Sequence, residues 1–223
     1  MMKMLGRGVY NITEAAALTQ LRTARVREWF RGRRSGTGFS PVFQSDFPVV
    51  GGDYAISFLD LVELFIAGRL RELRVSLQYI RKVYTHLETE YGKHPLCSRE
   101  IFVSDNDKKK IFTRGLSDAE SKHVIEALTR QCYFEKIILP FLHRIDYDEA
   151  TNLARRWRIF EGIVVDPSLC FGKPIVEEVG ISTMILSSAY YSNARNAGRV
   201  AEWFDISPSH VQAAVAFEDW LAA

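Results

Sequence analysis

A dense cluster of arginines near the N-terminus is the part of the sequence with the clearest chemistry. Thirteen consecutive positions carry six arginines against one acid, Glu28, in a chain whose net charge is only +2. The arginines are Arg22, Arg25, Arg27, Arg31, Arg33 and Arg34. A guanidinium group grips a phosphate with two hydrogen bonds and also reads the edge of guanine. We therefore expect these arginines, together with Thr23, to bind DNA; the alternative is the solvated basic face of a helical hairpin.

Residues 9–34 predict two short helices joined by a tight turn, which would position these arginines. Thr13 is expected to cap the first helix and Thr23 the second, because a hydroxyl there accepts a backbone N–H. Apolar side chains recur at the inward positions of a helix-turn-helix, namely Ala16, Leu18, Leu21, Val26 and Trp29. The second helix would then present its arginines to the major groove and to the flanking phosphates.

Composition narrows the class of protein. The chain has 223 residues, 47% of them hydrophobic and 25% charged, which is an ordinary globular balance. We expect no membrane partner, because no apolar run reaches the roughly 18 residues of a membrane span and the first residues lack a signal-peptide core. Cys97, Cys132 and Cys170 are too far apart for a zinc or dithiol motif. A cytoplasmic protein without metal or other cofactor is therefore expected.

The segment that follows the arginines predicts small strands and then a helix. Residues 42–56 contain short extended pieces around a glycine turn, which would form the wing of a winged helix. A helix is predicted over residues 57–68. Asp60 and Glu63 lie one turn apart in it and could act as paired carboxylates. A structural role is favoured, because the sequence places no histidine or third acid beside them.

A heptad pattern marks the next predicted helix, residues 76–91. Its apolar seam consists of Leu77, Ile80, Tyr84, Leu87 and Tyr91. Two heptads are too few for an independent coiled coil, so the seam could belong to the core. A homodimer seam is the alternative, because DNA-reading helices commonly work as symmetric pairs.

The remaining pattern predicts a mainly α fold with small β elements. A hairpin is expected over residues 101–112 and a helix over 117–129, where Ser117 and Glu120 have capping-box spacing. Short strands are expected after residue 161, followed by helices over 183–191, 199–204 and 208–221. The predicted domains are a winged helix-turn-helix domain over 1–95, a connecting region over 96–160, and a three-helix, helix-turn-helix-like domain over 161–223.

The apolar pattern of residues 16–26 recurs at the same spacing in residues 201–211. Ala16, Leu18, Leu21 and Val26 correspond to Ala201, Trp203, Ile206 and Val211, all predicted to point inward. The outward arginines are replaced by Ser207, His210 and Gln212. Because phosphate affinity depends on cationic side chains, the C-terminal copy is expected to contact protein rather than DNA.

Several motifs in order resemble a known bacterial family. Residues 10–17 and 26–30 resemble the start of a MerR-type winged helix. Residues 56–63, 75–81 and 93–95 resemble VapB-like antitoxins, and residues 164–167, 171–175 and 200–204 resemble the antitoxin-associated C-terminal domain of unknown function found with them. That domain usually continues with Gly-Thr-Arg-Ile-Pro, whereas this chain has Glu178-Val-Gly-Ile-Ser182. The missing arginine leaves open which surface would block a toxin.

The resemblance implies the antitoxin of a type II toxin–antitoxin system. Such a protein would neutralise a PIN-like ribonuclease toxin and repress its own operon by binding operator DNA, as a homodimer. A PIN-like active site gathers carboxylates around a divalent metal, so basic side chains of a partner could occupy it. The candidate toxin-binding residues are Arg155, Arg156, Trp157, Arg158, Phe171 and Lys173.

Two other classes of function are weighed against the antitoxin. A MerR-like transcriptional regulator could respond to a small-molecule ligand through its C-terminal half, which would require a pocket there. An enzyme is disfavoured and no catalytic residue is assigned, because the five histidines are scattered and none lies in a nucleophile or metal motif.

Overall fold

The computed structural model describes residues 6–32, 41–49, 52, 54–99 and 143–223, together with the backbone of four short strands between residues 101 and 134. The chain divides into two compact units. The first consists of Met1–Arg27, Ser45–Phe58 and Arg155–Ala223, and the second of Glu28–Gln44 and Leu59–Ala154. The mainly α fold with small antiparallel sheets is confirmed. Every helix in the described part of the chain is too short or too polar to cross a bilayer.

Helix α1 (Ile12–Thr19) opens the first unit, and its cap differs from the prediction. Asn11 is the N-cap: its side chain accepts the Glu14 N–H at 2.8 Å, and the Glu14 carboxylate accepts the Asn11 N–H at 3.0 Å. This reciprocal capping box satisfies two backbone donors at once, whereas a cap at Thr13 would satisfy one. Thr13 therefore lies inside the first turn, and the prediction that it caps the helix is wrong.

Helix α2 (Thr23–Arg31) follows after a three-residue turn. Gln20 adopts a left-handed conformation with φ 57°, and the Leu21 N–H donates to the Ala16 carbonyl at 2.9 Å, which closes α1. The Arg22 carbonyl accepts the Arg25 N–H at 2.8 Å and the Val26 N–H at 3.2 Å, and these bonds begin the new helix. Arg22 thus holds the cap position, and Thr23, expected as the cap, is the first helical residue.

The segment expected to form a wing is mostly irregular where the structure describes it. Within residues 41–49 and 54–56, Ile56 makes an isolated antiparallel bridge with Tyr10, with N–H to carbonyl distances of 2.8 and 2.9 Å. The N–H groups of Val42 and Phe43 donate to the Trp29 carbonyl at 2.8 and 3.2 Å instead of pairing in a hairpin. They cap the end of α2, which outweighs the local strand preference.

Two longer helices form the centre of the second unit. Helix α3 (Phe58–Glu72) runs through Gly68, four residues beyond its predicted end. Helix α4 (Leu77–Tyr91) is capped by Ser76, which accepts the Tyr79 N–H at 3.1 Å, and ends at Gly92 as predicted. The 3₁₀ turn Pro95–Cys97 follows. Fully buried side chains that hold these helices are Leu61, Val62, Leu64, Ile66, Ile80, Val83 and Leu87.

A four-stranded antiparallel meander follows in the second unit. Its strands, in the order β1-β2-β3-β4, are Ile101–Val103, Ile111–Arg114, His123–Glu126 and Cys132–Phe134. The hairpin predicted over residues 101–112 is confirmed, with Phe102 opposite Phe112. The helix predicted over 117–129 is wrong, because residues 123–126 pair with β2. Val124 and Ile125 are β-branched and suit a pleated strand, so pairing overrides the capping-box signal.

The second sheet has the strand order β5-β6-β7-β8. Strand β5 is Ile145–Tyr147, β6 Ala154–Phe160, β7 Ile163–Val165 and β8 Ile175–Val176. In the first unit, β6 and β7 form a hairpin around Gly162, with Trp157 opposite Val165. The side chains of β7 and β8 are all buried, which gives this unit its β core.

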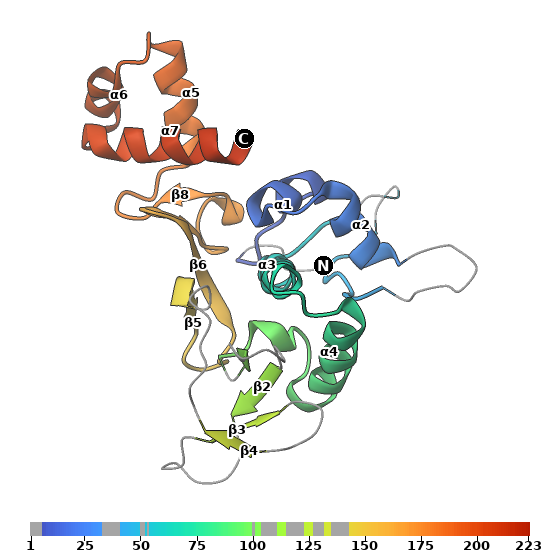
Figure 1. Ribbon diagram of the computed structural model, residues 1–223. Coiled ribbons are helices and arrows are strands. Elements are labelled where there is room, and N and C mark those ends of the chain that lie inside the picture. The colour runs from blue at the N-terminus through green and yellow to red at the C-terminus, as the bar shows by residue number, and fades with distance from the viewer. Residues whose placement is uncertain are drawn as a thin grey trace. The chain divides into compact units, whose positions relative to one another are not determined.

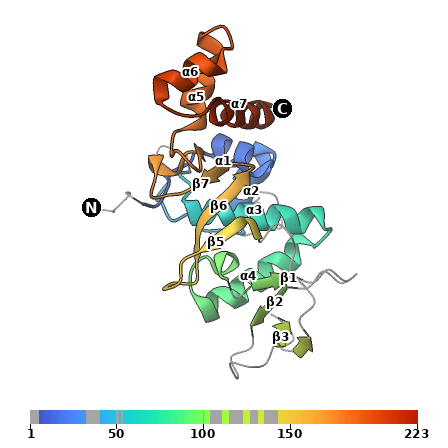
Figure 2. The same cartoon turned by 90° about the vertical axis from the view of Figure 1, so that its left-hand side faces the viewer.

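Three C-terminal helices complete the first unit. They are α5 (Thr183–Ser192), α6 (Ala197–Phe204) and α7 (Pro208–Ala222), and α7 packs against the other two (Figures 1 and 2). Asn196 caps α6, and Ser207 caps α7 ahead of Pro208, as predicted for α7. Val211 and Ala201 are buried, as the repeated apolar pattern predicts. Trp203 is 55% exposed, so its predicted inward position is wrong.

Candidate nucleic-acid interface

Helix α2 carries its arginines on its exposed surface. The exposed members of the predicted set are Arg22, Arg25, Arg27 and Arg31. Thr23 is half-buried at the first turn, and Arg33 and Arg34 lie outside the described residues. Arg27 and Arg31 are four positions apart and so share one side of the helix, while Arg25 lies on another side. Guanidinium groups are therefore exposed to solvent along the length of the helix.

The opposite side of α2 is fixed by burial, so the arginines are held on a rigid support. In the first unit Val26 is fully buried, as are Leu18 and Ala16 of α1. In the second unit Trp29 packs edge-on against Phe43, with ring centroids 6.0 Å apart. The inward positions predicted for the helix-turn-helix are confirmed as buried. A helix held in this way can present side chains to a duplex without first becoming ordered.

The second predicted basic group, on β6, is largely neutralised within its own unit. Arg156 Nε lies 3.2 Å from Asp166 and its Nη1 lies 3.4 Å from Glu177. Arg158 Nε lies 3.7 Å from the same Glu177. Trp157 is 2% exposed, so it belongs to the core and cannot contact a partner as predicted. The alternation of a strand turns it inward while the arginines on either side point out.

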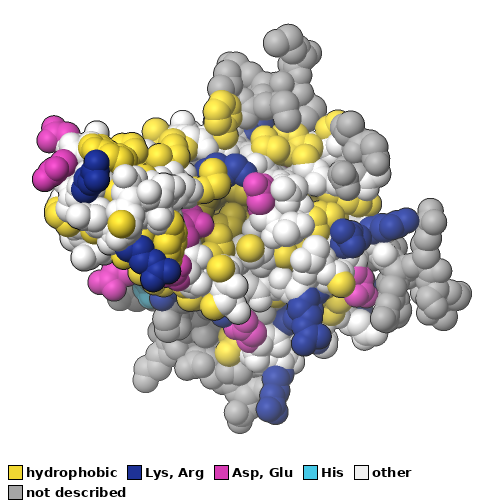
Figure 3. Space-filling model, turned by 90° about the horizontal axis from the view of Figure 1, so that it is seen from above, with side chains coloured by type: hydrophobic (Ala, Val, Ile, Leu, Met, Phe, Trp, Pro, Cys, Tyr) yellow, Lys and Arg dark blue, Asp and Glu magenta, His cyan; other side chains and the backbone are white. Residues whose placement is uncertain are grey.

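The other predicted toxin-binding residues differ in accessibility. Lys173 Nζ lies 2.6 Å from Glu14, so its charge is paired with α1. Phe171 is 70% exposed in a left-handed turn between β7 and β8, and Arg155 is exposed on β6. On the face seen in Figure 3, hydrophobic side chains are exposed in several places, with basic and acidic side chains spread between them. Of the predicted set, Arg155 and Phe171 are the best placed to meet a partner.

Asp166, which was not predicted as a functional residue, pairs with Arg156 of β6. Its burial alone would raise the pKa of the carboxyl group. The Ser168 hydroxyl and N–H, and the Arg156 guanidinium, donate to the charged form and hold the pKa of Asp166 below its usual range.

This lowered pKa gives a pH-dependent contribution to stability. Because the folded pKa lies below the unfolded one, ionised Asp166 stabilises the fold above about pH 4, and this contribution is lost as the pH falls through the folded pKa. We expect wild type and Asp166→Asn to differ by a constant unfolding free energy above about pH 5 and by less below about pH 4. Denaturant unfolding at a series of pH values measures this; a difference that stays constant into acid would contradict it.

The predicted dimer seam on α4 belongs to the interior of the second unit. Ile80, Tyr84 and Leu87 are buried, and the Tyr84 ring meets Phe43 edge-on at 5.2 Å. Leu77 and Tyr91 are half-buried. The heptad pattern therefore reflects packing within the chain, the alternative left open by the sequence. A homodimer would have to use other residues.

The chain is similar to a named bacterial protein and to a solved structure. No protein family in the comparison matches the chain. A protein of Mycobacterium tuberculosis (strain ATCC 25618 / H37Rv) named "Putative antitoxin VapB45" is 21% identical over 189 residues, 78% of either chain. The X-ray crystal structure of Rv2018 from Mycobacterium tuberculosis has a TM-score of 0.64 and 19% identity, and covers 92% of this chain and 96% of that one. The chain thus shares a fold with the second protein and resembles a protein named as an antitoxin.

The second unit contains a buried polar cluster that was not predicted from the sequence. Glu63 Oε2 accepts the Tyr84 hydroxyl at 3.1 Å and lies 3.2 Å from His94 Nδ1, and Glu63 Oε1 accepts the Leu96 N–H at 3.3 Å. Burial raises the pKa of Glu63, and its bonds with His94 and Tyr84 act against this. A histidine does lie beside the predicted carboxylate, 31 residues further along the chain. Because the cluster is closed to solvent, it supports the structural role.

Proposed function

We propose that this protein is the antitoxin of a type II toxin–antitoxin system and a repressor of its own operon. The proposal rests on the exposed arginines of α2, a helix whose Val26 and Trp29 side chains are buried and hold it in place. The resemblance to a protein named as an antitoxin supports the same class. The role is regulatory binding rather than catalysis. MerR-type winged-helix character belongs to this proposal and rests on sequence resemblance.

Operator binding follows from the placement of the arginines. We assign base reading to Arg27 and Arg31, which share one side of α2, and phosphate contacts to Arg22 and Arg25, which lie on another side. Thr23 in the first turn would add a hydroxyl contact. The protein would bind a palindromic operator as a homodimer, with one α2 in each half-site.

Toxin binding is assigned to the β6 and β7–β8 surface of the first unit. Exposed Phe171 offers an apolar anchor, and Arg155 a cation for the acidic metal site of a PIN-like ribonuclease. Arg156, Arg158 and Lys173 are already paired and would have to exchange partners to take part. Glu178, in the segment that lacks the family's arginine, lies 2.8 Å from His210 Nε2.

One experiment tests both halves of the proposal. The full chain is expressed with the product of the neighbouring reading frame and titrated with duplex DNA from upstream of its own gene at several salt concentrations. We expect a complex with a small ribonuclease, loss of RNA cleavage within it, and DNA affinity that falls linearly with the logarithm of salt concentration. Failure to bind upstream DNA at low salt would remove the repressor role, and failure to recover or inhibit a nuclease would remove the antitoxin role.

A further inference from the structure

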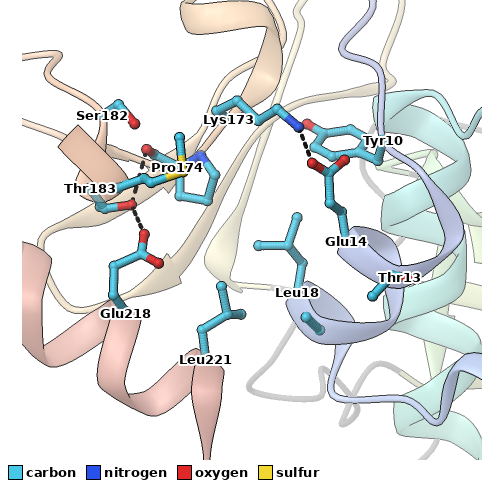
Figure 4. Close-up of a pocket in the computed structure, with 12 residues that line it drawn as sticks. Tyr10, Thr13, Glu14, Leu18, Lys173, Pro174, Ser182, Thr183, Glu218 and Leu221 are labelled. Carbon is cyan, nitrogen blue, oxygen red and sulfur yellow. Dashed lines mark hydrogen bonds and ion pairs between the residues drawn. The ribbon is translucent and has the colours of Figure 1, made fainter. Parts of the chain in front are cut away.

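A cavity of about 290 Å³ lies inside the first unit (Figure 4). Helix α1, the residues before β8, the start of α5 and the end of α7 all line it. Its wall is largely apolar, with Leu18, Pro174, Met184 and Leu221. Met184 is 63% exposed, which marks the mouth of the cavity. A concave apolar site with a few polar groups is the usual form of a small-molecule pocket.

The polar groups of the cavity leave one negative charge without a matching cation. On the α1 side, the 2.6 Å pair between Lys173 and Glu14 is neutral overall. On the opposite side, Glu218 accepts a hydrogen bond from the Thr183 hydroxyl (Figure 4). Among the residues that the structure describes, no basic side chain pairs with Glu218. A half-buried carboxylate in apolar surroundings gains from a cation that reaches it.

Ser182 adds a second polar group on the same side as Glu218. It is the N-cap of α5, yet its hydroxyl makes no capping bond, and the residue is 8% exposed. Ser182 lines the cavity, and its hydroxyl can accept a hydrogen bond from a bound donor that reaches it. The Tyr10 hydroxyl on the other side is committed to the Gly172 carbonyl at 2.6 Å.

We propose that this cavity binds a small organic cation with an apolar body. The body would lie on Leu18, Met184 and Leu221, and the ammonium or guanidinium group would meet Glu218 and Ser182. An anion would be repelled by Glu218, and a neutral apolar ligand would bury that carboxylate without a partner. The ligand would touch α1 and the C-terminal helices together and so stabilise their contact. This is the ligand-responsive alternative raised by the sequence, and it does not depend on antitoxin activity.

The test uses the full chain and matched probes. We expect n-hexylamine or 4-phenylbutylamine to bind at neutral pH in isothermal titration calorimetry, and hexanoate and ammonium chloride not to bind. Glu218→Gln keeps an acceptor for Thr183 and is expected to weaken amine binding by about tenfold to a hundredfold. Glu202→Gln removes the same charge from the exposed surface of α6 and is expected to bind like wild type.

A second variant keeps the test decisive if Glu218→Gln does not fold. Ala17→Met extends a side chain from α1 into the cavity at a residue that suits a helix, and it should abolish amine binding. Circular dichroism melting confirms that each variant is folded. The proposal is overturned if neither amine binds at millimolar concentration, if hexanoate binds as well as the amines, or if folded Glu218→Gln binds like wild type. None of these results bears on operator or toxin binding.

Discussion

Replacing Arg25 and Arg27 together by alanine is expected to lower affinity for upstream duplex DNA by about a hundredfold, because Arg27 contributes about 1–3 kcal/mol when it reads a base and Arg25 loses a phosphate contact. Both side chains are exposed on α2, and alanine preserves the helix. Because the Arg25 contact is to phosphate, the slope of log affinity against log salt concentration should become shallower by about one. Fluorescence anisotropy across a salt series measures both quantities.

The matched control is the double variant Arg195→Ala/Arg199→Ala, which removes two exposed guanidinium groups from the turn between α5 and α6 and from the first turn of α6. Both positions belong to the C-terminal bundle, where the arginines of α2 have no counterparts, so DNA affinity should change by less than about twofold. Equal losses in the control and in the α2 variant would mean that binding follows net charge alone. The assignment of α2 as the reading helix would then fail.

Glu63→Ala is expected to lower the free energy of unfolding by about 3–5 kcal/mol, the largest effect of any acidic residue considered in this protein. The substitution removes the buried carboxylate that bonds the Tyr84 hydroxyl, the Leu96 N–H and the His94 ring. Glu63 is fully buried, so these bonds are made away from bulk solvent. Urea unfolding followed by circular dichroism measures the loss, provided that the slope with denaturant stays constant.

Glu72→Ala is the control, because Glu72 lies in the same helix α3 and makes an exposed pair with Arg69 at 2.7 Å. Exposed pairs contribute little, so a change of at most about 1 kcal/mol is expected. Should both variants lose the same small amount of stability, the Glu63 cluster would not be a structural anchor of the second unit.

Local periodicity predicted the helices well, because it depends on neighbours in the sequence. Val26 and Trp29 recur at helical spacing in α2, and both are buried, as is Leu18 in α1. The three C-terminal helices lie within two residues of their predicted starts for the same reason. Caps were harder to place: Asn11 and Thr13 both resemble caps, and the reciprocal bond with Glu14 decides between them.

Features that depend on distant partners could not be predicted. Residues 123–126 form a strand because β2 and β4 pair with them. The α4 seam looked like a dimer surface because its partner, Phe43, is 41 positions away from Tyr84 in the sequence. In the candidate site, the sequence named the exposed arginines but not the pairing of Arg156 with Asp166 or of Lys173 with Glu14. The fold brings the members of such pairs together, so their spacing in the sequence does not reveal them.

The two compact units are interleaved along the chain, which bears on how the protein tolerates cleavage. The first unit combines its N-terminal helix with residues from Arg155 onward, and the Tyr10 hydroxyl bonds to Gly172, 162 positions away. A nick between residues 59 and 154 would therefore divide both units between two fragments. Each fragment would lack half of the first unit's interior, so a cut chain should regain its structure by complementation of the two pieces rather than as independent parts.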